Sequence, residues 1–160
     1  MKEYEGYTGP LSREEYYGKD REKLGFKETV FHHFKFLVEE YGFRCVSSGL
    51  LHVEYESKKV FVGVYHERLS DELEIRVGLL KQENMRGYTL QDILLFKGKD
   101  DLYQQLENKR AEHVKYLGAS TAEEVRKYVP IIAELLREYA LPAIQGNPGF
   151  YEQLDKSRRR

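Results

Sequence analysis

The chain has 160 residues, of which 33% are charged and 41% are hydrophobic. This balance is typical of one folded domain and excludes a disordered or fibrous chain. The formal net charge of −1 argues against a nucleic-acid binder that is held by phosphate contacts, so we expect no nucleic-acid partner. The single cysteine, Cys45, excludes an internal disulfide, and its place in an apolar alternation favours a small core residue over a nucleophile.

Composition divides the chain into three segments. Residues 1–19 are rich in Tyr, Glu and Gly and are expected to form an irregular arm. Residues 20–155 are expected to form a single domain, and residues 156–160 a solvated basic tail with a charge of +4, whose alternative role is RNA binding. The longest apolar runs, such as Ile93–Phe96, are far shorter than the roughly 20 residues of a membrane-spanning helix. The first residues also lack the apolar stretch of a secretory signal, so we expect a cytoplasmic protein without a membrane partner.

The first predicted helix covers residues 27–41. Its apolar residues recur at three- and four-residue spacing, which is the pattern of a helix with one buried face. They are Val30, Phe31, Phe34, Leu37, Val38 and Tyr41. Gly42 follows at the position where a left-handed residue commonly ends a helix.

Four antiparallel strands are predicted between Phe43 and Leu80, because apolar and polar residues alternate along each of them. This period of two gives the sheet one buried face and one polar face. The residues expected on the buried face are Phe43, Cys45, Leu51, Val53, Tyr55, Val60, Val62, Val64, Leu73, Ile75, Val77 and Leu79.

The register of the two hairpins follows from keeping these apolar residues on one face. A three-residue loop that ends at Gly49 places Cys45 opposite Leu51. A two-residue loop formed by the lysine pair places Tyr55 opposite Val62. The strands are then sequential neighbours in a meander.

The helical period returns after the sheet. Thr89 caps a short helix, and residues 101–117 are expected to form a charged helix. A long helix begins at Ser120 or Thr121 and contains Pro130, so we expect a kink or a break there. A last short helix follows a Gly-Asn-Pro-Gly loop. The predicted fold is therefore α+β, with an N-terminal helix, a four-stranded antiparallel meander, and three to four C-terminal helices packed on the sheet.

The polar face of the sheet is the candidate partner-binding surface. It combines aromatic residues and arginine with acids, which is the composition of protein–protein interfaces. The candidate residues are Arg44, His52, Glu54, Phe61, Tyr65 and Arg76. The alternative is that a helix such as 101–117 covers part of this face.

Catalytic and metal-binding motifs are absent from the sequence, so we predict no catalytic residue, no metal site and no cofactor. His52, Glu54 and Glu56 share one strand face and could ligate a metal, but an ordinary solvated strand face explains them more simply. His66 is expected on the opposite face and cannot join them. A small metal-dependent or acid/base hydrolase built from scattered acids and histidines is the alternative function.

Three segments resemble small uncharacterised bacterial α+β proteins, some of which look like immunity proteins of contact-dependent or polymorphic toxin systems. The segments are Val38–Phe43, Lys59–Val64 and Tyr88–Leu94. The resemblance covers residues 27–155 and implies a non-enzymatic, cytosolic antidote that binds one toxin and blocks its active site. It brings no site motif and therefore no functional residue. The charge of −5 over residues 1–155 would suit a basic toxin.

Overall fold

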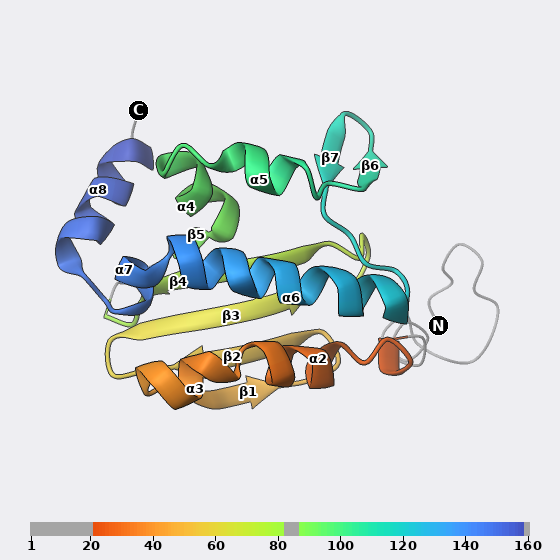
Figure 1. Ribbon diagram of the computed structural model, residues 1–160, viewed down its shortest axis with the longest axis horizontal. Coiled ribbons are helices and arrows are strands. Elements are labelled where there is room, and N and C mark those ends of the chain that lie inside the picture. Colours follow the sequence, from red (N-terminus) through yellow and green to blue (C-terminus); the bar gives the residue numbers. More distant parts are fainter. Residues whose placement is uncertain (1–20, 82–86, 159–160) are drawn as a thin grey trace, which may run out of the picture.

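The computed structural model describes residues 21–81 and 87–158, so the expected arm of residues 1–19 lies outside the described residues (Figure 1). The fold is α+β and is built on a five-stranded antiparallel sheet with the strand order β1-β2-β3-β4-β5. The strands are β1 (Arg44–Ser48), β2 (His52–Glu56), β3 (Val60–His66), β4 (Leu73–Leu79) and β5 (Tyr88–Thr89). The helices are α2 (Phe26–His33), α3 (Lys35–Tyr41), α4 (Leu90–Phe96), α5 (Asp100–Gln104), α6 (Ala122–Tyr139), α7 (Leu141–Ile144) and α8 (Pro148–Arg158), and a separate hairpin consists of β6 (Lys109–Ala111) and β7 (Val114–Tyr116).

The predicted register at the centre of the sheet is confirmed. Tyr55 lies opposite Val62, and Val53 lies opposite Val64. One face of β2, β3 and β4 is buried as the alternation predicted, and helices α2, α3 and α6 lie over it in Figure 1. None of the described helices is both long and apolar enough to span a bilayer.

The predicted first helix consists of two helices, α2 and α3, separated at Phe34. Phe34 and Phe36 would lie about 200° apart on a continuous helix, yet both are buried. The break therefore turns both rings toward the core. In contrast, α6 continues through Pro130 without a break. Its buried face stabilises the helix around the missing hydrogen bond.

The predicted register of the first hairpin is wrong. Cys45 lies opposite Tyr55, and a β-bulge at Val46 shifts the pairing between Cys45 and Ser47. A bulge adds one residue to one strand, so the alternation of apolar residues could not locate it. Because β1 is the edge strand, Cys45 is exposed and is not the core residue that we predicted.

The predicted helix over residues 101–117 is also wrong, because this segment forms α5 and the β6–β7 hairpin. Asn108 fixes the base of the hairpin: its side-chain Oδ1 accepts from the Gly118 N–H at 2.9 Å, and its Nδ2 donates to the Gly118 carbonyl at 3.0 Å. Such bonds between an asparagine side chain and the backbone compete with helix formation. Val114 lies in β7 and is 62% exposed.

The sheet has a fifth strand that we did not predict, because β5 is only two residues long and leads directly into α4. The C-terminal helix packs against it. The Arg158 guanidinium lies 3.9 Å from the ring centroid of Tyr88, and Arg158 Nη2 donates to the Gly87 carbonyl at 2.9 Å. Lys156 and Arg158, which we assigned to a solvated tail, are thus part of α8.

A buried arginine joins the segment before α2 to the connection between β3 and β4. Arg21 is 4% exposed. Its Nη2 donates to the carbonyls of Glu67 at 2.8 Å and Arg68 at 2.6 Å, and it forms an ion pair with Asp71 at 2.7 Å. These contacts offset the free-energy cost of removing the Arg21 guanidinium charge from water.

His66 lies beside this ion pair and is 1% exposed. Its Nε2 donates to the Ala119 carbonyl at 2.7 Å, and its ring stacks on Phe26. Burial, and then the nearby charge of Arg21, lower the pKa of His66 from 6.5 to about 4. The imidazole is therefore neutral in the folded protein near pH 7.

We predict that His66 makes the folded protein less stable in acid. Its folded pKa lies below its unfolded value, so its contribution is complete above about pH 6.5 and is lost as the pH falls toward 4. The difference between the unfolded and folded pKa values of His66 corresponds to about 3 kcal/mol in the free energy of unfolding. Urea unfolding should be compared for the wild type and His66→Gln, whose amide still offers a donor. The stability advantage of the wild type should shrink from pH 7 to pH 4, whereas a constant difference would contradict the prediction.

Candidate functional site

The candidate site is the face of the sheet that is turned away from α2, α3 and α6 (Figure 1). We call it the outer face. The register places the following side chains or glycines on it: Arg44, Ser47, His52, Glu54, Glu56, Phe61, Gly63, Tyr65, Glu74, Arg76 and Gly78. The segment 101–117, which we considered as a cover for this face, instead places α5 against α4.

Two aromatic rings lie against the outer face because glycines lie beneath them. A Cβ atom at Gly63 would overlap the ring and hydroxyl of Tyr65. A Cβ atom at Gly78 would lie 2.6 Å from Cε1 of Phe61. The Phe61 ring covers a glycine of the neighbouring strand β4, whereas the Tyr65 ring covers a glycine two residues away on its own strand. In both places the ring fills the space that a side chain would have occupied. The two glycines therefore determine where the rings of Phe61 and Tyr65 lie.

Polar side chains on the outer face are paired with one another. The Tyr65 hydroxyl donates to Glu54 Oε2 at 2.7 Å, and Arg76 Nε donates to Glu74 Oε2 at 2.8 Å. Burial and the hydrogen bond to Glu54 both raise the pKa of Tyr65, so its hydroxyl keeps its proton and remains a donor. These contacts hold the side chains in defined positions on the outer face.

Glu54 and Tyr65 are shared by two hollows of the outer face. The smaller has a volume of about 190 Å³ and is lined by Val46, Glu54, Tyr55, Glu56, Phe61 and Tyr65. The larger has a volume of about 450 Å³ and is lined by Leu51, His52, Glu54, Tyr65, His66, Glu67 and Arg68. Tyr65 thus borders both hollows, and tyrosine is enriched among the residues that anchor protein interfaces.

The structure places the six predicted partner-binding residues on one surface. His52, Glu54, Phe61, Tyr65 and Arg76 lie on β2, β3 and β4, and Arg44 lies on the edge strand opposite Glu56. Sequence reasoning missed Val46, which the bulge brings to the smaller hollow. It also left out Glu56 and Glu74, although the alternation places both on the polar face.

His52 and His66, the two histidines considered with the metal alternative, lie on opposite faces of the sheet. In residues 21–81 and 87–158, no group of three or more His, Cys, Asp or Glu side chains is arranged to hold a metal ion. His52 instead forms a hydrogen bond of 2.9 Å with Ser47. His66 lies on the buried side of β3, as we predicted.

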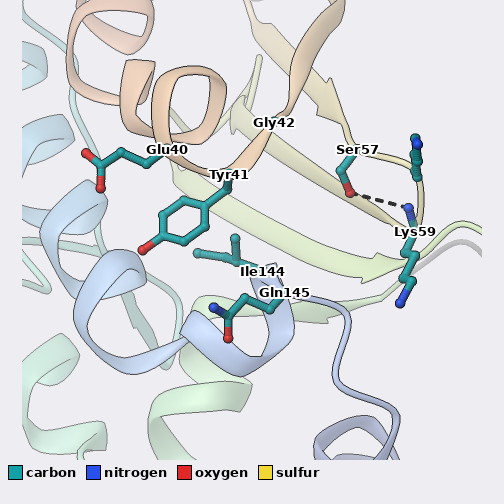
Figure 2. Close-up of a pocket in the computed structure, with 8 residues that line it drawn as sticks. Glu40, Tyr41, Gly42, Ser57, Lys59, Ile144 and Gln145 are labelled. Atoms are coloured by element: carbon teal, nitrogen blue, oxygen red, sulfur yellow. Dashed lines mark hydrogen bonds between the residues drawn. The ribbon is translucent and has the colours of Figure 1, made fainter.

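A further hollow of about 480 Å³ lies between the end of α3, the β2–β3 turn and α7 (Figure 2). Tyr41 and Ile144 contribute apolar surface to it, and two exposed lysines of the turn lie on its other side. Its one lining carboxylate, Glu40, is already held by Arg137 at 2.8 and 2.9 Å.

Comparisons with known proteins assign no family to this chain. No family model, no curated protein and no solved structure matches it. The resemblance to immunity proteins consequently stays a prediction.

We predict that alanine is tolerated better at Gly63 than at Gly78. The added methyl at Gly63 would meet only the far end of the Tyr65 side chain, which can rotate away at a cost of about 1 kcal/mol, the value of one hydrogen bond. At Gly78 it would meet both the Phe61 ring and the Cα atom of Gly87 at 2.8 Å, so the backbone must shift. We expect a loss of about 1–3 kcal/mol there. Urea unfolding of Gly63→Ala and Gly78→Ala measures the free energy of unfolding that each variant loses. Equal losses in the two variants would contradict the prediction.

Proposed function

We propose that this chain is a non-enzymatic protein-binding module that uses the outer face, and that it acts as an immunity-type inhibitor of a bacterial toxin. The observation that carries the proposal is the pair of rings, Phe61 and Tyr65, held over glycines beside two hollows. The inhibitor role rests in addition on the resemblance of three sequence segments to immunity proteins.

Pre-arranged aromatic side chains favour tight binding for an energetic reason. Association immobilises side chains, at a cost of about 0.5–1.5 kcal/mol for each flexible one. The ring of Tyr65 is already fixed by its hydrogen bond to Glu54, and Arg76 is already paired with Glu74. Less of the binding energy is therefore spent on ordering this surface.

The charge of the outer face indicates which partners it would accept. It carries three glutamates (Glu54, Glu56 and Glu74) and two arginines (Arg44 and Arg76), which gives a slight negative excess. A partner with basic groups at its contact surface would match this excess. A toxin that acts on nucleic acid would present such groups, and an inhibitor needs only to cover them.

The test is the affinity for a partner isolated from the host of this protein. Tagged protein should be recovered from a host lysate after nuclease treatment, and the Kd of any stoichiometric companion should then be measured. We expect the double variant Phe61→Ala/Tyr65→Ala to weaken binding at least 30-fold, since interface anchors contribute about 2 kcal/mol or more.

The matched control is the double variant Leu95→Ala/Val114→Ala. Leu95 and Val114 are exposed apolar residues of α4 and β7, 64% and 62% exposed, and neither belongs to the outer face. The control should bind within twofold of the wild type. An unchanged affinity of the Phe61/Tyr65 variant, with its circular dichroism preserved, would show that the partner binds elsewhere.

A further inference from the structure

The smaller hollow lies beside the rings of Phe61 and Tyr65, which form part of its lining. Phe61 lies opposite both Glu56 and Gly78 in the register, and its ring lies over Gly78 on the β4 side. The Tyr65 ring lies over Gly63 on its own strand. The space above β2 is therefore left open.

The wall of this hollow nearest the sheet edge comes from the β1 bulge. Val46 is the extra residue of the bulge, is 42% exposed, and lines the hollow together with Phe61 and Tyr65. The walls are thus largely apolar or aromatic. The volume of about 190 Å³ corresponds to about six water molecules at about 30 Å³ each. It is smaller than a typical small-molecule pocket of about 300–1,000 Å³ and suits a single long side chain.

The polar groups of the hollow are two carboxylates. Glu54 accepts the Tyr65 hydroxyl through one oxygen and has remaining capacity to accept. Glu56 is half-buried, and within the described part of the chain its carboxylate forms no hydrogen bond or ion pair. Arg44 lies opposite Glu56 in the register, but these two side chains form no ion pair. Glu56 therefore meets a partner as an unneutralised carboxylate among apolar walls.

This combination selects one kind of occupant. A neutral apolar side chain would cover Glu56 without pairing it, and burying an unpaired carboxylate is costly. An anion would be repelled by both carboxylates. A lysine or arginine places its methylene stem against apolar walls and its charged head on the carboxylates, and its cation is also attracted to aromatic rings.

We infer that the hollow lined by Val46, Glu56 and Phe61 receives a lysine or arginine side chain, and that it determines the preference of the outer face for a basic partner segment. The inference rests on the proposed function for the identity of the segment as part of a protein. The chemistry of the hollow can be tested without knowing that protein.

The probe is N-acetyl-arginine-N-methylamide, titrated into the ¹⁵N-labelled full chain and followed by the amide signals of Glu56, Phe61 and Gly63. We expect saturable shifts with a Kd in the millimolar range. The neutral analogue N-acetyl-citrulline-N-methylamide has nearly the same shape and should bind at least fivefold more weakly. Equal shifts with the two compounds would overturn the inference, because the charge would then contribute nothing.

Variants locate the effect on the surface. Glu56→Gln keeps the size of the side chain and should weaken arginine binding at least fivefold. Glu74→Gln makes the same charge change on the same face but outside the hollow, and it should leave the Kd within twofold. Equal losses in both variants would indicate general attraction to an acidic face and would overturn the assignment of the hollow.

The probe experiment and the partner experiment can reject their respective proposals independently of each other. Glu56-dependent arginine binding, combined with a partner that is insensitive to Phe61→Ala/Tyr65→Ala, would support the hollow and reject the proposed interface. The opposite pair of results would support the interface and reject the hollow as a receptor for a basic side chain.

Discussion

The rest of the structure depends on the burial of only one face of the sheet. β3 pairs with β2 and β4 over its length, and its alternate valines all point toward the helices. A slip of one residue would turn these valines to the outer face, so the register is strongly determined. The same constraint decides the composition of the outer face, since every second residue is directed there. Gly63 and Gly78 occupy two of those positions and leave room for rings that would otherwise project into solvent.

How much of the fold could be predicted depended on whether local pattern and tertiary packing agreed. The β2–β3 hairpin was predictable because its alternation continues across a two-residue loop. The β1 register was not, since the bulge at Val46 interrupts the period without any change in residue type. Residues 101–117 are charged, with few apolar positions, so their spacing could not separate a helix from a short helix plus a hairpin. There the side chain of Asn108 decided the outcome.

The candidate site was likewise only partly predictable from the sequence. The period of two alone predicts that five of the candidate residues share one surface. They are His52, Glu54, Phe61, Tyr65 and Arg76. The direction in which each ring lies does not follow from it, because the Phe61 ring turns toward Gly78 of the neighbouring strand and the Tyr65 ring toward Gly63 of its own strand. The smaller hollow depends in addition on the bulge, so its existence could not be read from the sequence. The sequence therefore predicted which residues lie on the outer face. The positions of their side chains and the hollows between them depend on how the strands pair.

The contact between α2 and α6 has a consequence for synthesis of the chain on the ribosome. The strands β1–β4 are sequential neighbours and can pair once Leu79 is made, with α2 and α3 beside them. α6, which packs on α2, is complete only at Tyr139, 60 residues later. At about 5–20 residues per second, the valine-rich face remains incompletely covered for about 3–12 s. During this interval, protection from aggregation has to come from chaperones or from the ribosome, and the emergence of α6 is the event that ends the need for it.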